Sequence, residues 1–133
     1  MKQILILGIL LILGGCAKKT LSKSVSTNAH NIITLSDTYE VIISKVVSDS
    51  RCPKDVNCVW AGEVELVLSV YKNNVFYKDE TLTISFKSFP ESKWILEKYT
   101  SSKSIKSIEV LPEKKQGVEI KLEDYSLKID FEN

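Results

Sequence analysis

The fold is decided by one stretch in the middle of the chain, Glu63-Val-Glu-Leu-Val-Leu-Ser-Val-Tyr-Lys-Asn-Asn-Val-Phe-Tyr77. Its first half places an apolar residue at every second position, namely Val64, Leu66, Leu68 and Val70. A period of two over this length predicts a strand with one face against a core. The pair Asn73-Asn74 tolerates positive φ, so we expect a tight hairpin turn into the next strand.

Further strands are expected on both sides of this hairpin. Residues 39–47 begin with alternation and end in an apolar pair, and residues 81–86 place Leu82, Ile84 and Phe86 on one face. Near the end of the chain, residues 105–111 precede a polar turn at 114–117, after which two apolar patterns follow, one from Val118 and one over 126–131. The sequence therefore predicts strands in each of these segments.

Residues 94–99, Trp-Ile-Leu-Glu-Lys-Tyr, fit either a helical turn or a strand, and we interpret them as a short strand. Seven or eight short strands without a long helical pattern indicate an all-β domain over residues 32–133. Its architecture is expected to be an antiparallel β-sandwich or a flattened barrel. One disulfide-stapled loop is expected to interrupt this architecture.

The N-terminus has the order of an export signal: Lys2, an apolar run from Ile4 to Leu13, and then Leu13-Gly-Gly-Cys16. The apolar run is about half the roughly 20 residues that a spanning helix needs, so it indicates a cleaved leader. Residues 13–16 resemble the lipobox of bacterial lipoproteins. That resemblance implies removal of residues 1–15 and a lipid on Cys16, and two or more acyl chains would anchor the protein stably to a membrane.

An ordinary secretory signal, cleaved after a later small residue such as Ala17, is the alternative for this leader. If Cys16 is lipidated, the residue after it matters for sorting. Among lipoproteins of Gram-negative type an Asp there resembles an inner-membrane retention signal, and here the residue is Ala17. The resemblance therefore favours the outer membrane, with the domain facing the periplasm.

Residues 16–31 form an expected flexible tether, because they are rich in Lys, Thr, Ser and Asn and poor in apolar residues. The chain as a whole has a formal charge of +1, and the loss of Lys2 with the leader makes the remainder neutral. A neutral chain without a basic stripe gives no electrostatic footprint for nucleic acid. We therefore expect no nucleic-acid partner.

The most individual segment is residues 49–63, Asp-Ser-Arg-Cys-Pro-Lys-Asp-Val-Asn-Cys-Val-Trp-Ala-Gly-Glu, between two predicted strands. Once Cys16 carries lipid, Cys52 and Cys58 are the two remaining thiols, and an oxidising compartment favours a disulfide between them. Pro53 fixes φ after the first cysteine, and Gly62 permits a bend or a close approach. The segment is expected to be a rigid loop.

This segment resembles a motif of small secreted or lipid-anchored bacterial β-domains: Arg-Cys-Pro, four residues, then Cys, one residue and Trp-Ala-Gly-Glu. The resemblance supports the disulfide and the all-β fold. That family has no assigned activity, so no catalytic residue is implied.

Two interpretations remain open for the loop. In the first, Trp60 packs over the disulfide and Arg51 pairs with an acidic neighbour such as Asp49, Asp55 or Glu63. In the second, Arg51, Pro53, Lys54 and Trp60 form a recognition loop. Exposed Trp and Arg on a preorganised element are typical of binding hot spots. A narrower form of the second is protease inhibition, with Arg51 or Lys54 offered to a trypsin-like pocket.

Catalytic and metal sites have little support. His30, the one histidine, lies in the expected tether, which leaves no general base for a nucleophilic serine or cysteine in the domain. Five residues separate Cys52 from Cys58, more than a zinc knuckle uses. Both an exchange-active dithiol and a carboxylate pair of glycosidase type are less favoured alternatives. We expect no cofactor and no metal.

The sequence thus predicts a cell-envelope lipoprotein whose β-domain is a non-catalytic binding, interaction or structural module. Its expected partners are the membrane, through Cys16, and an envelope protein. A disulfide-loop protease inhibitor is the second hypothesis and an envelope enzyme with a carboxylate site is the third.

Overall fold

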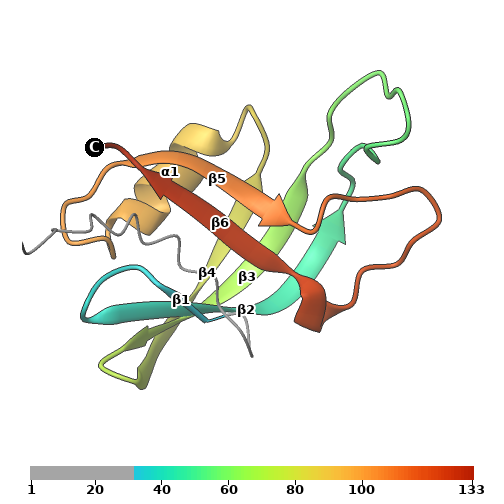
Figure 1. Ribbon diagram of the computed structural model, residues 1–133. Helices are drawn as coiled ribbons and strands as arrows, with labels where there is room; N and C mark the ends of the chain where they lie inside the picture. The colour runs from blue at the N-terminus through green and yellow to red at the C-terminus, as the bar shows by residue number, and fades with distance from the viewer. Residues whose placement is uncertain (1–31) are drawn as a thin grey trace, which may run out of the picture.

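The computed structural model describes residues 32–133 (Figure 1). The expected leader, the lipidation site Cys16, the tether and His30 lie outside these residues. Six strands and two helices follow in the order β1 (Ile32–Thr34), β2 (Tyr39–Asp49), β3 (Val64–Lys72), β4 (Val75–Ile84), α1 (Phe89–Glu97), β5 (Ile105–Leu111), the 3-10 helix η1 (Leu122–Asp124) and β6 (Ser126–Phe131). The part of the chain that is described contains no helix long and apolar enough to cross a membrane.

The strands form two antiparallel sheets, so the predicted all-β fold is confirmed. One sheet has the order β1-β2-β3-β4, and the other contains β5 and β6. The β5–β6 pair crosses in front of the larger sheet in Figure 1. The sheets do not close into a barrel, and the described residues form six strands instead of the predicted seven or eight.

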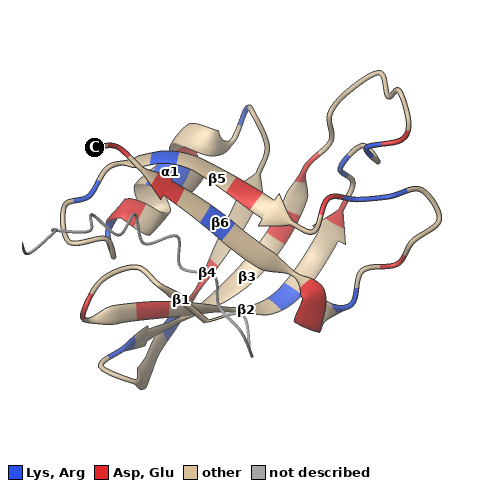
Figure 2. Ribbon diagram, viewed as in Figure 1, with Lys and Arg blue, Asp and Glu red and all other residues tan. Residues whose placement is uncertain are grey.

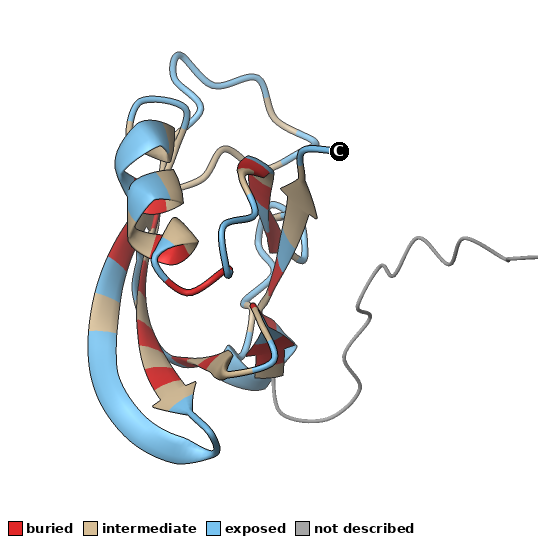
Figure 3. Cartoon of the chain, turned by 90° about the vertical axis from the view of Figure 1, so that its left-hand side faces the viewer, coloured by how far each residue is buried: buried red, intermediate tan, exposed pale blue. Residues whose placement is uncertain are grey.

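The central hairpin has the expected form. On β3 the residues at alternate positions from Val64 to Val70 are fully buried, which matches the alternation in the sequence. Asn73 and Asn74 have φ of 50° and 65°, so both adopt the left-handed conformation that a tight hairpin requires. The hairpin extends past the core, because residues 75–79 of β4 are exposed on both faces. Figure 3 shows these exposed residues in pale blue beside the alternate buried stripes.

The interpretation of residues 94–99 as a short strand is wrong. The structure instead has helix α1, which begins after Ser88 and carries a proline in its first turn. Proline suits this position because the first helical N–H groups have no intrahelical partner. The buried residues Ser92 and Leu96 lie one turn apart on the face toward the sheet, and Ser92 Oγ donates to the carbonyl oxygen of Thr83 at 2.7 Å. The helix therefore packs on the end of β4.

Two other details of the predicted pattern are also wrong. Phe86 does not share the inner face of Leu82, because β4 ends at Ile84 and the Phe86 side chain is 95% exposed. The chain from Pro112 to Lys121 is a long loop, and no strand begins at Val118. Val118 is exposed, so nothing in the core holds an extended segment there.

The core lies between the two sheets and is closed at one end by α1. It is formed by inward-facing aliphatic residues of both sheets together with two tyrosines. The buried set is Ile33, Leu35, Val41, Ile43, Val64, Leu66, Leu68, Val70, Leu82, Leu96, Tyr99, Ile105, Ile108, Val110, Tyr125 and Leu127. This core fixes the ends of β2, β3, β4 and β5 relative to one another, and the candidate site is built from those ends.

Candidate functional site

The predicted disulfide between Cys52 and Cys58 is present, with the two Cα atoms 5.9 Å apart. It closes the connection between β2 and β3, residues 50–63, which we call the stapled loop. Ser50 N–H donates to the Glu63 carbonyl and Cys52 N–H to the Ala61 carbonyl, both at 2.8 Å. These bonds continue the β2–β3 ladder into the base of the loop.

Gly62 lets the two arms of the stapled loop approach closely. Its φ is +75°, and a Cβ atom placed on it would lie 2.0 Å from the carbonyl oxygen of Ser50. Both the conformation and the space therefore require glycine at this position. The glycine of the Trp-Ala-Gly-Glu motif thus has a structural explanation.

The stapled loop is also tied to the long loop 112–121. Lys54 N–H donates to the Lys114 carbonyl at 2.9 Å, and Gln116 N–H donates to the Asp55 carboxylate at 3.1 Å. The Lys54 ammonium pairs with Glu113 at 2.6 Å. Two segments that are distant in the sequence therefore brace each other.

Arg51 lies at the base of the stapled loop and links the two sheets. Its guanidinium donates to both carboxylate oxygens of Asp49, at 2.9 and 2.7 Å, and its third nitrogen donates to the Val110 carbonyl at 2.6 Å. Tyr125 donates its hydroxyl proton to the same Asp49 carboxylate at 2.9 Å. We call Asp49, Arg51 and Tyr125 the Asp49 network.

Charge and hydrogen bonding favour the ionised form of Asp49. Burial opposes its ionisation, but hydrogen bonds from Arg51 and Tyr125 outweigh the burial and hold the Asp49 pKa below its ordinary value. Burial and the hydrogen bond to Asp49 raise the pKa of the Tyr125 hydroxyl. The network is therefore an ion pair with a neutral tyrosine across the neutral pH range.

The structure separates the four predicted loop residues into two groups. Arg51 is engaged as the first interpretation expected, with Asp49, and its side chain is only 18% exposed. Trp60 is 62% exposed, so most of its surface is not covered by packing over the disulfide. Pro53 is half-buried, and Lys54 is exposed in its pair with Glu113. Trp60 and Lys54 are presented to solvent, whereas Arg51 is an internal connector.

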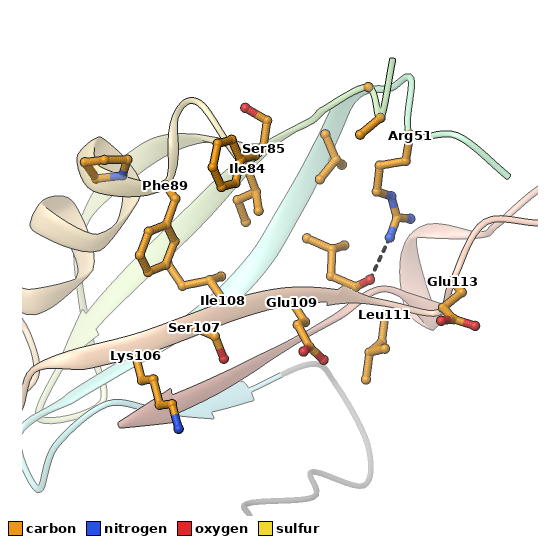
Figure 4. A pocket seen from close by; sticks show the side chains of 16 residues that line it. Arg51, Ile84, Ser85, Phe89, Lys106, Ser107, Ile108, Glu109, Leu111 and Glu113 are labelled. Atoms are coloured by element: carbon orange, nitrogen blue, oxygen red, sulfur yellow. Dashed lines mark hydrogen bonds between the residues drawn. The ribbon is translucent and has the colours of Figure 1, made fainter. Parts of the chain in front are cut away.

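A groove of about 750 Å³ lies beside the base of the stapled loop. One wall is formed by Ala61, Gly62 and Val64, and a second by the end of β4 with the first residues of α1. The third wall is β5, of which residues 106–111 all line the groove. Figure 4 shows Phe89 and Ile108 turned toward each other, with the bond from Arg51 at one end.

The groove is mainly apolar, and its charged residues are already paired in part. Arg51 belongs to the Asp49 network, Glu113 pairs with Lys54, and Glu109 pairs with Lys128 at 3.2 Å. A volume of this size lies within the range of about 300 to 1,000 Å³ typical of ligand sites. Its composition suits binding of an apolar or amphipathic group.

Sequence reasoning did not find the groove. Its wall residues come from β3, β4, α1 and β5, and no local pattern relates Phe86 and Phe89 to Ile108. The exposed Phe86 was predicted to be a core residue. The stapled loop was the one part of the site that the sequence singled out.

A second cluster of titratable groups lies away from the groove. Tyr99 donates to Glu80, which also pairs with Lys78 at 2.6 Å. Burial and then the bond to Glu80 raise the pKa of Tyr99 to about 12. Burial opposes ionisation of Glu80, but hydrogen bonds from Lys78 and Tyr99 hold its pKa below the usual range. This cluster connects β4 to Tyr99, the second residue after the end of α1.

Neither clusters of metal-ligating side chains nor concentrations of one charge indicate a further site within the described part of the chain. Within residues 32–133, no group of three His, Cys, Asp or Glu side chains is placed to hold a metal ion. Figure 2 shows acidic and basic residues interspersed along the same strands.

Comparisons with protein-family models, with curated proteins and with solved structures find no match for this chain.

Proposed function

We propose that this chain is a lipid-anchored protein of the cell envelope whose β-domain binds another molecule without catalysing a reaction. The leader and the Leu13-Gly-Gly-Cys16 junction support the anchor. The groove beside the stapled loop supports the binding role, and it is the observation that carries the proposal. Phe86 at the rim is 95% exposed, an unusual state for a large aromatic side chain.

The surroundings of the groove favour binding over a purely structural role. The disulfide and the Asp49 network hold the groove wall in place, so little ordering entropy is lost when a ligand binds. Val59 and Trp60 are also exposed on the stapled loop, next to the groove residue Ala61. Phe86 therefore lines a preformed apolar groove, and the exposed Trp60 directly precedes a groove residue in the sequence; large exposed aromatic residues are typical of interaction hot spots.

Site-directed photo-cross-linking in the producing cells tests this proposal. A photoreactive phenylalanine analogue replaces Trp60 or Phe86 in the full chain, and the same analogue at Val75, on the distant hairpin tip, is the control. We expect a discrete adduct from positions 60 and 86 and none from position 75. Equal labelling from all three positions, or from none, would reject binding at the groove.

A double variant connects the adduct to the groove. With the analogue at position 60, Phe86→Asp places a charge at the groove rim and is expected to abolish the adduct. Val75→Asp is the matched control, because it introduces the same charge at another exposed apolar position, and it should leave the adduct unchanged.

Protease inhibition is the second candidate, and Lys54 is the residue that favours it. Its side chain is 68% exposed on a disulfide-closed loop, and its surface pair with Glu113 costs little to break. Titration of the full chain into trypsin should then give stoichiometric inhibition that Lys54→Ala removes. The absence of inhibition would reject this candidate and leave the groove proposal intact.

A further inference from the structure

We propose that the groove accepts one extended segment of a partner polypeptide, which adds as a strand to the free edge of β5. This inference rests on the proposed binding function and names the class of ligand. It is carried by three features of the groove: the edge of β5 that no other described strand pairs with, the direction of its peptide groups, and the opposite wall at the end of β4.

The first feature is the continuity of the β5 wall. Strand β5 pairs with β6 and with no other strand of residues 32–133, so one of its edges is unpaired. The six consecutive residues from Lys106 to Leu111 all line the groove. Successive side chains of a strand point to opposite faces. A wall made of every residue in turn is therefore the main-chain edge of the strand.

The second feature is the direction of the peptide groups. The Val110 carbonyl accepts a bond from Arg51, at the groove, and so does not point toward β6. In an antiparallel strand the N–H and C=O of one residue point to the same side, and the side alternates along the chain. The N–H and C=O of Ile108 therefore also point toward the groove. These groups are the donor and acceptor that an added strand requires.

The third feature is the opposite wall. Ile84, Ser85 and Phe86 line the groove consecutively where β4 ends, and β4 pairs with β3 alone among the described strands. The groove thus separates the last strand of the larger sheet from the first strand of the smaller one. A strand added to β5 would direct alternate side chains to the apolar surface of Val64, Phe89 and Ile108.

This geometry distinguishes a polypeptide from other occupants. A hydrocarbon chain would cover the N–H and C=O of Ile108 without bonding to them, which is unfavourable for buried polar groups. A second copy of this domain would bring β5 with β6 attached to its other side, and β6 would also have to fit against the wall at Ile84–Phe86. A single extended segment has both edges free and satisfies both constraints.

The ends of the available edge are also defined. Arg51 occupies the Val110 carbonyl at one end. At the other end the β5–β6 register shifts between Ile105 and Ser107, which makes Lys106 the extra residue of a bulge. The partner contact is therefore short and centred on Ile108.

The test uses a phage-displayed library of short linear peptides, panned on the full chain reconstituted in lipid nanodiscs. The Phe86→Asp variant serves for counter-selection, and Val75→Asp is the matched control that should bind as the wild type does. We expect enriched peptides with apolar residues at alternate positions. In hydrogen exchange, saturating peptide should slow exchange of the Ile108 amide at least about tenfold, because that N–H becomes bonded.

Backbone N-methylation of the enriched peptide gives the second readout. Methylation of alternate residues in one register should weaken binding by about tenfold or more, whereas methylation in the other register should leave binding nearly unchanged. Equal tolerance of both registers, or an Ile108 amide that stays unprotected, would overturn strand addition. Either result is expected if the peptide binds through its side chains and not through its main chain.

The outcomes also separate this inference from the proposed function. Binding that Phe86→Asp abolishes, but that shows no register dependence, refutes the added strand and keeps the groove as a binding site. No enrichment on the wild type over Phe86→Asp overturns the added strand, and the cross-linking experiment at positions 60 and 86 then decides the proposed function independently.

Discussion

The guanidinium of Arg51 lies 2.6 Å from the carbonyl oxygen of Val110, a residue 59 positions later in the sequence. The same guanidinium forms a two-point pair with Asp49 on β2. One side chain therefore joins the end of the larger sheet to an edge carbonyl of the smaller sheet. The base of the stapled loop and one end of the groove depend on this connection.

Arg51→Ala is expected to lower the free energy of unfolding by about 2 to 4 kcal/mol, because Asp49 would lose its charged partner in a largely buried position. Urea unfolding followed by circular dichroism measures the loss. Lys54→Ala breaks an ion pair that is exposed on both sides, so its cost should stay below about 1 kcal/mol. Equal costs for the two variants would contradict the structural role of Arg51.

The Asp49 network also predicts how stability depends on pH. The folded-state pKa of Asp49 is depressed, so its contribution is fully present above its ordinary value of 3.8 and is lost as pH falls through the lower folded-state pKa. The difference in unfolding free energy between the wild type and Asp49→Asn should therefore narrow as pH falls below 3.8. Urea midpoints across the acid range measure this. If the unfolding free energies of the wild type and Asp49→Asn changed in parallel with pH, Asp49 would not be the titrating group.

Gly62→Ala should destabilise the protein far more than the same change at Gly117. Both residues have positive φ, but a Cβ at Gly62 meets the Ser50 carbonyl, whereas a Cβ at Gly117 meets nothing within 4 Å. Gly117→Ala should cost only about 1 to 2 kcal/mol, from the left-handed conformation alone. Thermal unfolding of the two variants provides the comparison, and similar melting temperatures would argue against the close approach at Ser50.

Removal of the disulfide should cost about 2 to 2.5 kcal/mol by chain-entropy arithmetic for a closed loop of about seven residues. The double substitution of Cys52 and Cys58 by Ala tests this in denaturant unfolding. Because the main-chain bonds from residue 50 to Glu63 and from residue 52 to Ala61 do not involve the sulfur atoms, the circular dichroism spectrum of the sheets should persist. Loss of the whole fold would mean that the stapled loop nucleates the sheets.

Cys16→Ser should release the protein from the membrane fraction if the expected lipid anchor is present. The substitution removes the sulfur to which lipid would be attached, so an alkyne analogue of palmitate should label the wild type alone. Fractionation followed by immunoblotting measures the distribution. A wild type that is unlabelled and already absent from the membrane fraction would favour the ordinary secretory signal.

The part of the fold that could be predicted from sequence is the part with local patterns. The alternation from Val64 to Val70 predicts β3, and Asn73-Asn74 predicts the hairpin turn, because both signals lie within a few residues. The disulfide followed from the small number of cysteines. Each of these features depends on near neighbours or on composition.

Helix α1 was missed although its start signals are in the sequence. Ser88 and Pro90 at the beginning and Glu91 in the first turn are typical of a helix N-terminus. At Phe86 the alternation does not continue the strand, because the turn from Ser85 to Ser88 ends it through its own hydrogen bonds.

The candidate site was only half predictable. The stapled loop has a distinctive local sequence, but the groove requires Val110 and Ile108 to lie beside residues 51 and 86. Such pairings arise from how the two sheets pack, and one sequence carries no local signal for them. The pair of Arg51 with Asp49, two residues away, was one of the two interpretations of the loop, whereas the bond of Arg51 to Val110 has no local signal.

Few main-chain positions on β5 remain for an added strand, because Lys106 forms a bulge and the Val110 carbonyl already accepts a bond from Arg51. So short a contact implies a complex that forms and dissociates rapidly, since most affinity differences are expressed in the dissociation rate. Many copies held on one membrane would raise the effective concentration and restore a lasting attachment. A surface carrying this domain would then hold a repetitive or clustered partner firmly while exchanging single molecules freely.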